Sequence, residues 1–190
     1  DLDFKKLRYL GTKSSYHKNE RGCTMRVLVV GNGGREDALC KKLQESPFCE
    51  KLYCCPGNGG TARYAENLSL RSKEDIVSFA KENIDFVVVG PEKPLCEGLV
   101  DELERVGVKA FGPKKKAAQL EGSKDFTKRF LEKYALPTAR YKTVYSFEEA
   151  VEALQDFSYP LVIKADGLCA GKGVGILKDE ASAKQYLEEL

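Results

Sequence analysis

The sequence has few of the residues on which most hydrolases and zinc sites depend. Its 190 residues include one histidine, His17, and seven cysteines with no Cys-x-x-Cys pair. An odd number of cysteines without a secretory signal disfavours a disulfide framework, and the missing pair disfavours structural zinc. Because His17 is the only histidine, most Ser-His and Cys-His hydrolase mechanisms are excluded. We therefore expect reduced thiols and a cytoplasmic location.

Long apolar runs and a strong net charge are absent as well. The longest candidate run, residues 84–89, contains Asp85 and is far shorter than the roughly 20 residues that span a bilayer. The net charge is only +2. Residues 1–24 hold six basic and three acidic side chains, so the positive excess belongs to this segment and the remainder has no basic face. We expect neither a membrane nor a nucleic acid as partner.

From Met25 onward, short β-branched runs alternate with stretches of helical spacing. Continuous apolar runs are typical of parallel strands that are buried on both faces. Helical spacing follows at residues 34–45, at 72–80, where Ser72 and Asp75 resemble a capping box, and at 95–103. This order predicts an α/β fold with a doubly wound, Rossmann-like parallel sheet that binds ligands at the carboxyl ends of its strands. The expected strands are residues 26–30, 51–55, 67–70, 84–89 and 108–111.

The pattern changes near residues 121–122, where we place a domain boundary. Ser123 is a candidate helix cap, and the side chains of Phe126, Phe130, Leu131 and Tyr134 follow at helical spacing and are expected to face inward. The remaining expected elements are a strand at residues 141–144, a helix at 147–154, strands at 161–165 and 174–177, and a helix at 179–190.

Ten of the 17 glycines lie in three clusters, each after a predicted strand. Such turns suit phosphate because backbone N–H groups can approach a ligand, although each one alone is equally typical of a tight turn. The first cluster is no dinucleotide fingerprint, since Glu36 stands where a third glycine is needed, and the third is no Walker A loop. The clusters are Gly31, Gly33 and Gly34; Gly57, Gly59 and Gly60; and Gly167, Gly171, Gly173 and Gly175.

Lys164 lies near the end of an apolar strand, directly before the third glycine cluster, which also contains Lys172. A strand lysine beside a glycine loop can bind nucleotide phosphates, whereas the alternative is an edge lysine in solvent. The spacing matches a family at this point. The segments that resemble the ATP-grasp ligases are Gly-Pro at 112–113, Leu-Glu-Gly-Ser-Lys-Asp-Phe-Thr-Lys at 120–128 and Val-Ile-Lys-Ala-Asp-Gly-Leu-Cys-Ala-Gly-Lys-Gly-Val at 162–174.

Three further motifs narrow the resemblance. They are Gly-Asn-Gly-Gly-Arg-Glu at 31–36, Pro-Gly-Asn-Gly-Gly-Thr at 56–61 and Gly-Pro-Glu-Lys-Pro-Leu at 90–95. The ordered set resembles the glycinamide ribonucleotide synthetase family, the phosphoribosylamine–glycine ligases, over residues 25–190. The resemblance implies an enzyme of purine biosynthesis that joins glycine to 5-phosphoribosylamine. ATP phosphorylates the glycine carboxylate, and the sugar amine attacks the glycyl phosphate to give glycinamide ribonucleotide, ADP and phosphate.

The resemblance also assigns residues and domains. Lys164 would be catalytic, and ATP would bind at Lys124, Lys164, Gly167, Gly171, Lys172 and Gly173. Phosphoribosylamine would bind at Gly31, Asn32, Gly33, Gly34, Arg35, Pro56, Gly57, Asn58, Thr61 and Glu92. Residues 25–122 would be the substrate-binding α/β domain and 123–190 an incomplete ATP-grasp domain, after a disordered extension or cloning remnant at 1–24. Magnesium ligands are expected beyond residue 190 and none within the chain, so we expect the chain alone to be inactive.

One departure and two alternatives stay open. The family usually has histidine where this chain has Asp37, a carboxylate that would oppose a bound phosphate if it faced one. The first alternative is another ATP-grasp carboxylate–amine ligase, and the second is a nucleotide-binding module without catalysis. The sequence does not decide whether the parent enzyme is monofunctional or fused to other enzymes of purine synthesis.

Overall fold

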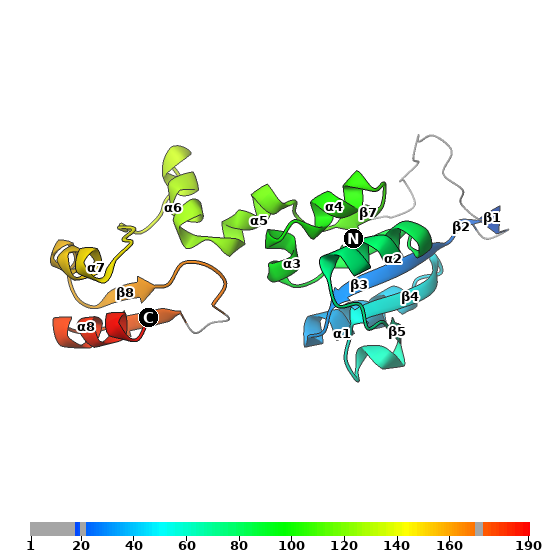
Figure 1. Cartoon of the computed structure of the whole chain (residues 1–190), viewed down its shortest axis with the longest axis horizontal. Helices are drawn as coiled ribbons and strands as arrows, with labels where there is room; N and C mark the ends of the chain where they lie inside the picture. The colour runs from blue at the N-terminus through cyan, green and yellow to red at the C-terminus, as the bar shows by residue number, and fades with distance from the viewer. Residues whose placement is uncertain (1–17, 20–21, 170–172) are drawn as a thin grey trace.

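Five parallel strands form the central sheet of the N-terminal part of the molecule, in the order β5-β4-β3-β6-β7 (Figure 1). The structure is a computed structural model that describes residues 18–19, 22–169 and 173–190. The chain winds outward from β3 in both directions, so the predicted doubly wound sheet is confirmed. The strands are β3 (Met25–Gly31), β4 (Cys49–Pro56), β5 (Glu66–Asn67), β6 (Phe86–Val89) and β7 (Lys109–Phe111).

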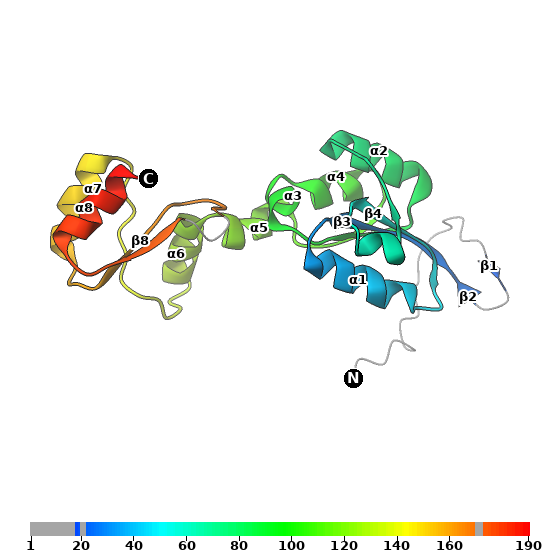
Figure 2. The same cartoon turned by 90° about the horizontal axis from the view of Figure 1, so that it is seen from below.

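The central strand β3 shows why this sheet is buried on both faces. Successive side chains of a strand point to opposite faces. Leu28 and Val30 therefore belong to one core cluster, while Val27 and Val29 join Cys40 in the other. Figure 2 shows helix α1 beneath the sheet and helices α2 and α4 above it. A run of four apolar residues is thus required, because each of its side chains meets a helix layer.

Capping side chains and glycines set the bounds of the helices in this part. Ser72 accepts a hydrogen bond from the amide of Asp75 at 3.0 Å, which confirms the predicted capping box. The prediction of a single helix at residues 95–103 is wrong. Gly98 adopts φ +86°, and the chain forms two short helices, one on each side of it. The helical elements are α1 (Gly34–Gln44), η2 (Thr61–Arg63), α2 (Lys73–Asn83), α3 (Glu92–Cys96) and α4 (Leu99–Arg105).

The C-terminal part follows through α5, which lies between the two parts in Figures 1 and 2. Ser123 ends α5 and caps α6, where it accepts a hydrogen bond from the Phe126 amide at 3.1 Å as predicted. The elements are α5 (Lys115–Gly122), α6 (Lys124–Lys133), α7 (Phe147–Ala153), η3 (Leu154–Asp156), β8 (Leu161–Lys164), β9 (Val174–Leu177) and α8 (Glu180–Glu188).

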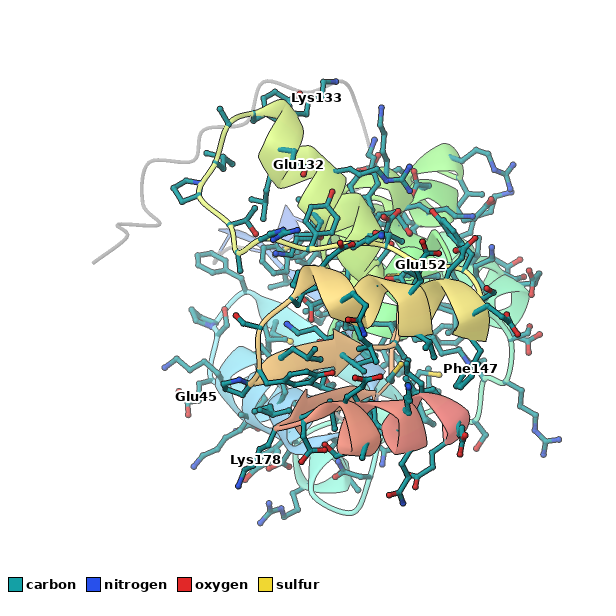
Figure 3. The ribbon with its side chains drawn as sticks, turned by 90° about the vertical axis from the view of Figure 1, so that its left-hand side faces the viewer. Glu45, Glu132, Lys133, Phe147, Glu152 and Lys178 are labelled. Atoms are coloured by element: carbon teal, nitrogen blue, oxygen red, sulfur yellow. The ribbon has the colours of Figure 1, made fainter. Side chains whose placement is uncertain are left out.

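A small core holds the C-terminal part together. The strands β8 and β9 form an antiparallel hairpin, with Leu161 opposite Leu177. Figure 3 shows α7 and α8 side by side along this hairpin. The buried cluster consists of Leu154, Leu161, Leu177 and Ala183. Only one face of the hairpin is covered by helices, and the side chains of Val162 and Ile176 on the strands are 51% and 72% exposed.

Two expectations for this part are wrong. Residues 141–144 do not form a strand: their backbone joins no ladder in the described structure, and Lys142 and Thr143 instead bond through side chains to Asp156 and Asp125. The apolar side chains of α6 do not reach a core, since α6 has no buried residue and Tyr134 is 55% exposed. Periodicity alone cannot say whether a second layer covers a helix face.

The described residues of the N-terminal segment are few. Residues 18–19 and 22–23 pair as the two-residue strands β1 (Lys18–Asn19) and β2 (Gly22–Cys23), and the rest of the expected disordered extension lies outside the described residues, except Thr24. Six cysteines with described side chains carry free thiols, namely Cys40, Cys49, Cys54, Cys55, Cys96 and Cys169. No helix in the described ranges has the length and apolar character to cross a membrane.

Candidate functional site

Three of the predicted motifs meet at one edge of the central sheet. Strand order reverses between β3 and β6, and ligands of doubly wound sheets bind beside the carboxyl ends of strands at such a reversal. The amide of Gly57 donates to the carbonyl of Gly31 at 3.0 Å, and the amide of Gly90 donates to the carbonyl of Val30 at 3.0 Å. The segments after β3, β4 and β6 are therefore hydrogen-bonded neighbours, as their place at strand ends predicted.

Asn58 fastens the second segment onto the glycine turn that follows β3. Its side-chain amide donates to the carbonyls of Asn32 at 2.8 Å and Gly33 at 3.2 Å. Gly57 must be glycine, since its φ is +71° and a Cβ there would lie 2.3 Å from the side chain of Asn67. The glycine turn precedes α1, so its exposed backbone amides lie at the positive end of a helix.

Thr61 organises this loop from inside. Its side chain is fully buried, and its hydroxyl accepts from the amide of Asn58 at 2.7 Å. The same hydroxyl lies within hydrogen-bond distance of the Asn67 side chain, at 2.8 Å, and of the Asn58 carbonyl, at 2.9 Å. A hydroxyl that is buried and bonded in this way supports the loop and does not line its surface. Asn67, which the sequence reasoning missed, also donates to the carbonyl of Asn58 at 2.8 Å.

Arg35 connects the first and third motifs. Its guanidinium contacts Glu92 at 3.0 Å and Glu36 at 3.1 Å. Hydrogen bonds to Glu92 and then to Glu36 raise the pKa of Arg35. The hydrogen bond from Arg35 is likewise the main reason that the pKa of Glu92 is lowered. The arginine side chain is still 52% exposed, so one side of it is open to a ligand.

Glu36 is a second residue that the sequence reasoning missed as part of the site. It is only 3% exposed, and its carboxylate accepts from the amide of Gly33 at 2.7 Å. A Cβ at Gly31 or Gly90 would lie 2.6 or 2.1 Å from this side chain. The glycines of two motifs thus leave room for one buried carboxylate. Its spacing from Gly33, three residues later at the start of a helix, is the signal that could have indicated this contact.

Asp37, the departure from the family pattern, lies partly buried on α1. Its Oδ1 atom has no hydrogen-bond partner among the described atoms and lies 3.7 Å from the guanidinium of Arg63. A Cβ at Gly60 would lie 2.3 Å from the same oxygen. The carboxylate therefore faces the loop after β4, beside the phosphate-suited turn.

The predicted ATP residues gather around the hairpin end of the C-terminal part. Lys164 ends β8 opposite Val174 and its residue is exposed. The ammonium of Lys124, on α6, donates to the carbonyl of Gly167 at 2.8 Å. Gly167 has φ +87°, which favours glycine. Gly173 accepts from the amide of Ala165 at 2.8 Å and so closes the base of the loop.

The remaining two predicted ATP residues, Gly171 and Lys172, lie outside the described residues. In the part that the structure describes, no hydrogen bond or ion pair connects the ATP residues to the glycine turn after β3. The chain therefore carries two separate sets of predicted site residues.

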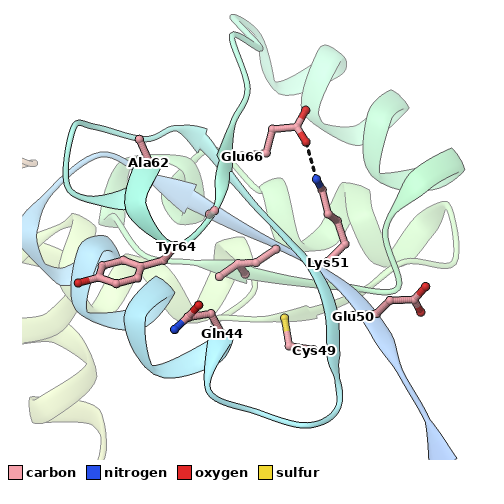
Figure 4. A pocket seen from close by; sticks show the side chains of 9 residues that line it. Gln44, Cys49, Glu50, Lys51, Ala62, Tyr64 and Glu66 are labelled. Carbon is pink, nitrogen blue, oxygen red and sulfur yellow. Dashed lines mark ion pairs between the residues drawn. The ribbon is translucent and has the colours of Figure 1, made fainter.

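Two shallow hollows of the described surface lie away from both sets of predicted site residues. One, of about 490 Å³, is lined by residues at the amino end of β4 and by the segment that leads to β5. Figure 4 shows its Lys51–Glu66 ion pair, whose atoms are 2.7 Å apart. It lies at the opposite end of β4 from Pro56 and the glycine turn, and its Lys51 and Glu66 side chains are paired with each other. We assign it no role in the predicted chemistry.

Metal-binding capacity is limited in the described ranges, where no group of three or more His, Cys, Asp or Glu side chains converges. The nearest acidic groups to the ATP residues are Asp125, engaged by Arg129 and Thr143, and Asp166, engaged by Ser123 and the amide of Lys124.

Family models match the chain in two consecutive segments. The model described as phosphoribosylglycinamide synthetase, N domain, matches residues 25–121, and the model of the ATP-grasp (A) domain of the same synthetase matches residues 122–190. A phosphoribosylamine–glycine ligase from Caldanaerobacter subterraneus subsp. tengcongensis is 52% identical over 167 residues, which are 86% of this chain and 40% of that protein. The chain thus spans about 40% of the length of such curated relatives.

Solved structures of related ligases also superpose on this chain. A phosphoribosylamine–glycine ligase from Thermotoga maritima superposes with a TM-score of 0.71 at 34% identity, over 84% of this chain and 38% of that one. An N5-carboxyaminoimidazole synthase from Aspergillus clavatus, solved with ADP and 5-aminoimidazole ribonucleotide, has a TM-score of 0.67 at 18% identity, over 88% of this chain and 44% of that one, and so shows the shared fold alone. By its family matches, its sequence identity and its fold, the chain belongs to the phosphoribosylglycinamide synthetase family.

Proposed function

We propose that the full-length protein containing this chain is an ATP-dependent carbon–nitrogen ligase that joins glycine to 5-phosphoribosylamine in purine biosynthesis. The observation that carries the proposal is the 52% identity to a phosphoribosylamine–glycine ligase over 167 residues, which are 86% of this chain. One set of site residues is suited to bind the sugar phosphate, and the other set is suited to bind the nucleotide.

The edge after β3, β4 and β6 is suited to phosphoribosylamine. The exposed guanidinium of Arg35 and the start of α1 favour an anion, while the amide of Gly33 is occupied by Glu36. Thr61 and Glu36 act behind this surface, since both are buried and bonded to the loops that form it. We assign the phosphate of the substrate to this edge.

The hairpin end is suited to ATP. Phosphoryl transfer is catalysed by placing positive charge and backbone donors around the transferring group. Lys164 and Lys124 supply the charge, and the segment from Gly167 to Gly173 supplies glycine backbone. The glycine carboxylate takes the γ-phosphoryl group and releases ADP, and the amine of phosphoribosylamine then attacks the acyl carbon and releases phosphate. Lys164 stabilises the negative charge during the first step.

Magnesium, when bound with ATP, would lower the charge repulsion among the phosphates. We propose that its protein ligands lie outside this chain, in the part that the longer relatives carry. We also propose that residues 25–122 form the substrate-binding domain and residues 123–190 the start of the ATP-grasp domain. The catalytic centre is then assembled only in the full-length protein.

The test is a stoichiometric assay of the full-length protein with ATP, Mg²⁺, glycine and phosphoribosylamine. We expect equimolar ADP and glycinamide ribonucleotide, measured by mass spectrometry, and no ADP when either glycine or the amine is left out. ADP release with another carboxylate or amine, but not with this pair, would favour another ATP-grasp ligase. ATP binding without turnover of any such pair would favour a non-catalytic module.

A further inference from the structure

We propose that Asp166 is a positioning residue, which fixes the start of the glycine loop to helix α6 so that Lys124 and Gly167 are held together for ATP. The inference rests on the proposed function, since it concerns the ATP residues named there. Asp166 follows β8 and directly precedes Gly167, so its backbone belongs to the loop while its side chain reaches another element.

The first step of the argument is the set of donors that Asp166 accepts. One carboxylate oxygen accepts from the amide of Lys124 at 2.6 Å and from that of Asp125 at 3.4 Å. The other accepts from the hydroxyl of Ser123 at 2.9 Å. The amides of Lys124 and Asp125 are the first of α6, and no carbonyl of the helix can accept a hydrogen bond from them. Asp166 therefore caps a helix that lies more than 40 residues away in the chain.

The second step is the contact that this cap brings with it. Lys124, whose amide Asp166 accepts, uses its own side chain to donate to the carbonyl of Gly167 at 2.8 Å. Asp166 and Gly167 on one side, and Lys124 on the other, form a closed ring of contacts. Without the Asp166 carboxylate, the hydrogen bond from the Lys124 ammonium to the Gly167 carbonyl is the only contact of this ring that still joins the loop to α6.

The charge state of Asp166 agrees with this role. Burial alone would raise its pKa, but hydrogen bonds from Ser123 and from the amides of Lys124, Gly167 and Asp125 lower it below its ordinary value. The carboxylate is thus ionised at neutral pH and favourably placed at the positive end of α6. Asparagine at this position would keep one acceptor oxygen and lose both the charge and the second acceptor.

Asp179 provides a matched control in the same part of the molecule. It caps α8, where its carboxylate accepts from the amide of Ser182 at 2.8 Å, and its pKa is lowered by that contact. Its cap joins neighbouring residues of one element and contacts none of the predicted ATP residues. Asp166→Ala and Asp179→Ala therefore each remove a helix cap, but only the first releases the glycine loop.

The experiment compares Asp166→Ala, Asp166→Asn and Asp179→Ala in the full-length protein by the affinity for ATP, measured by calorimetry without glycine. We expect about tenfold weaker ATP binding for Asp166→Ala, a partial recovery for Asp166→Asn and wild-type affinity for Asp179→Ala. Hydrogen exchange should quicken at the amides of Lys124 and Asp125 in Asp166→Ala alone. If Asp166→Ala does not fold, Asp166→Asn provides the same comparison.

Wild-type ATP affinity in Asp166→Ala, despite faster exchange, would reduce Asp166 to a structural cap and overturn the inference. An equal loss of affinity in Asp179→Ala would also overturn it, because the effect would then reflect general destabilisation. The proposed function is judged separately, by glycine-dependent ADP formation in the wild-type protein. A protein that binds ATP but does not ligate glycine disproves that function, and its ATP affinity still tests the role of Asp166.

Discussion

The two parts of the chain bury their apolar residues very differently. In the N-terminal part the sheet has helices on both faces, and Leu28, Val29, Leu99 and Leu103 are all 0% exposed. In the C-terminal part the hairpin has helices on one face, and Ile176 on its outer face is 72% exposed. Isolated two-stranded hairpins are marginal in water, so the second part depends more heavily on its few buried side chains. The proposed substrate and ATP sites thus fall on parts whose apolar residues are buried to different extents.

The chemistry of the C-terminal part gives the largest expected effect. Lys164→Ala in the full-length protein should lower the rate of glycinamide ribonucleotide formation by about 100-fold or more, because the proposed mechanism places the positive charge of this lysine beside the transferring phosphoryl group. Lys178→Ala is the matched control, since this exposed lysine follows β9 at the other end of the same hairpin. The measurement is the steady-state rate at saturating glycine. Equal rates for both variants would remove Lys164 from the site.

Core truncation tests the difference in burial directly. Leu28→Ala should destabilise the N-terminal part by about 3–5 kcal/mol, since the side chain is fully buried between strand neighbours and helices. Ile176→Ala should change stability by less than about 0.5 kcal/mol, because an exposed side chain loses little on truncation. Urea unfolding of this chain, followed by circular dichroism, measures both. A large cost for Ile176→Ala would mean that the outer face of the hairpin is covered in solution.

The loop after β4 tests whether the N-terminal site is as rigid as its core. Thr61→Val should cost about 1–3 kcal/mol, because the partly buried amide of Asn58 loses its acceptor. Thr24→Val is the control, since the Thr24 hydroxyl bonds to Glu50 at the surface. The free energy of unfolding gives the result. A cost no larger than that of the control would show that Asn58 finds another partner when the hydroxyl is removed.

The pH dependence of the Arg35–Glu92 contact gives the smallest expected effect. The folded pKa of Glu92 is lowered, so its contribution to stability is present above the ordinary pKa of glutamate and is lost as pH falls through the lowered folded value. For a largely exposed pair we expect less than about 1 kcal/mol. Glu92→Gln should flatten this part of the stability curve below about pH 5, measured by urea unfolding across pH. An unchanged curve would mean that the pair does not persist in solution.

The sequence predicted the N-terminal sheet and the position of the glycine clusters at strand ends because these signals are local. Buried parallel strands appear as apolar runs, and the glycine clusters follow them directly. It could not predict the break at Gly98 within one helical pattern, since helical spacing continues on both sides of the residue. It also failed for residues 141–144, because a strand needs a partner that local propensity does not supply.

Two of the missed residues have a different cause. Asn67 and Asp166 form hydrogen bonds with the backbone of other segments, whereas Glu36 accepts from the amide of Gly33 three residues earlier, a local contact that its spacing could have indicated. Which carboxylate or amide meets which distant amide is decided by the tertiary structure. A motif shows the glycines that allow such a contact, but not the side chain that fills the space.

The buried carboxylate of Glu36 lies inside the turn at which folds of this topology bind a ligand. In dinucleotide-binding folds the first glycine turn receives a pyrophosphate. Here a negative group of the protein itself already holds the Gly33 amide. A phosphate bound at this edge would therefore need donors other than the Gly33 amide, and the exposed guanidinium of Arg35 is one. The N-terminal part thus has the strand order of a dinucleotide-binding fold, but a glutamate carboxylate occupies one amide of its first glycine turn.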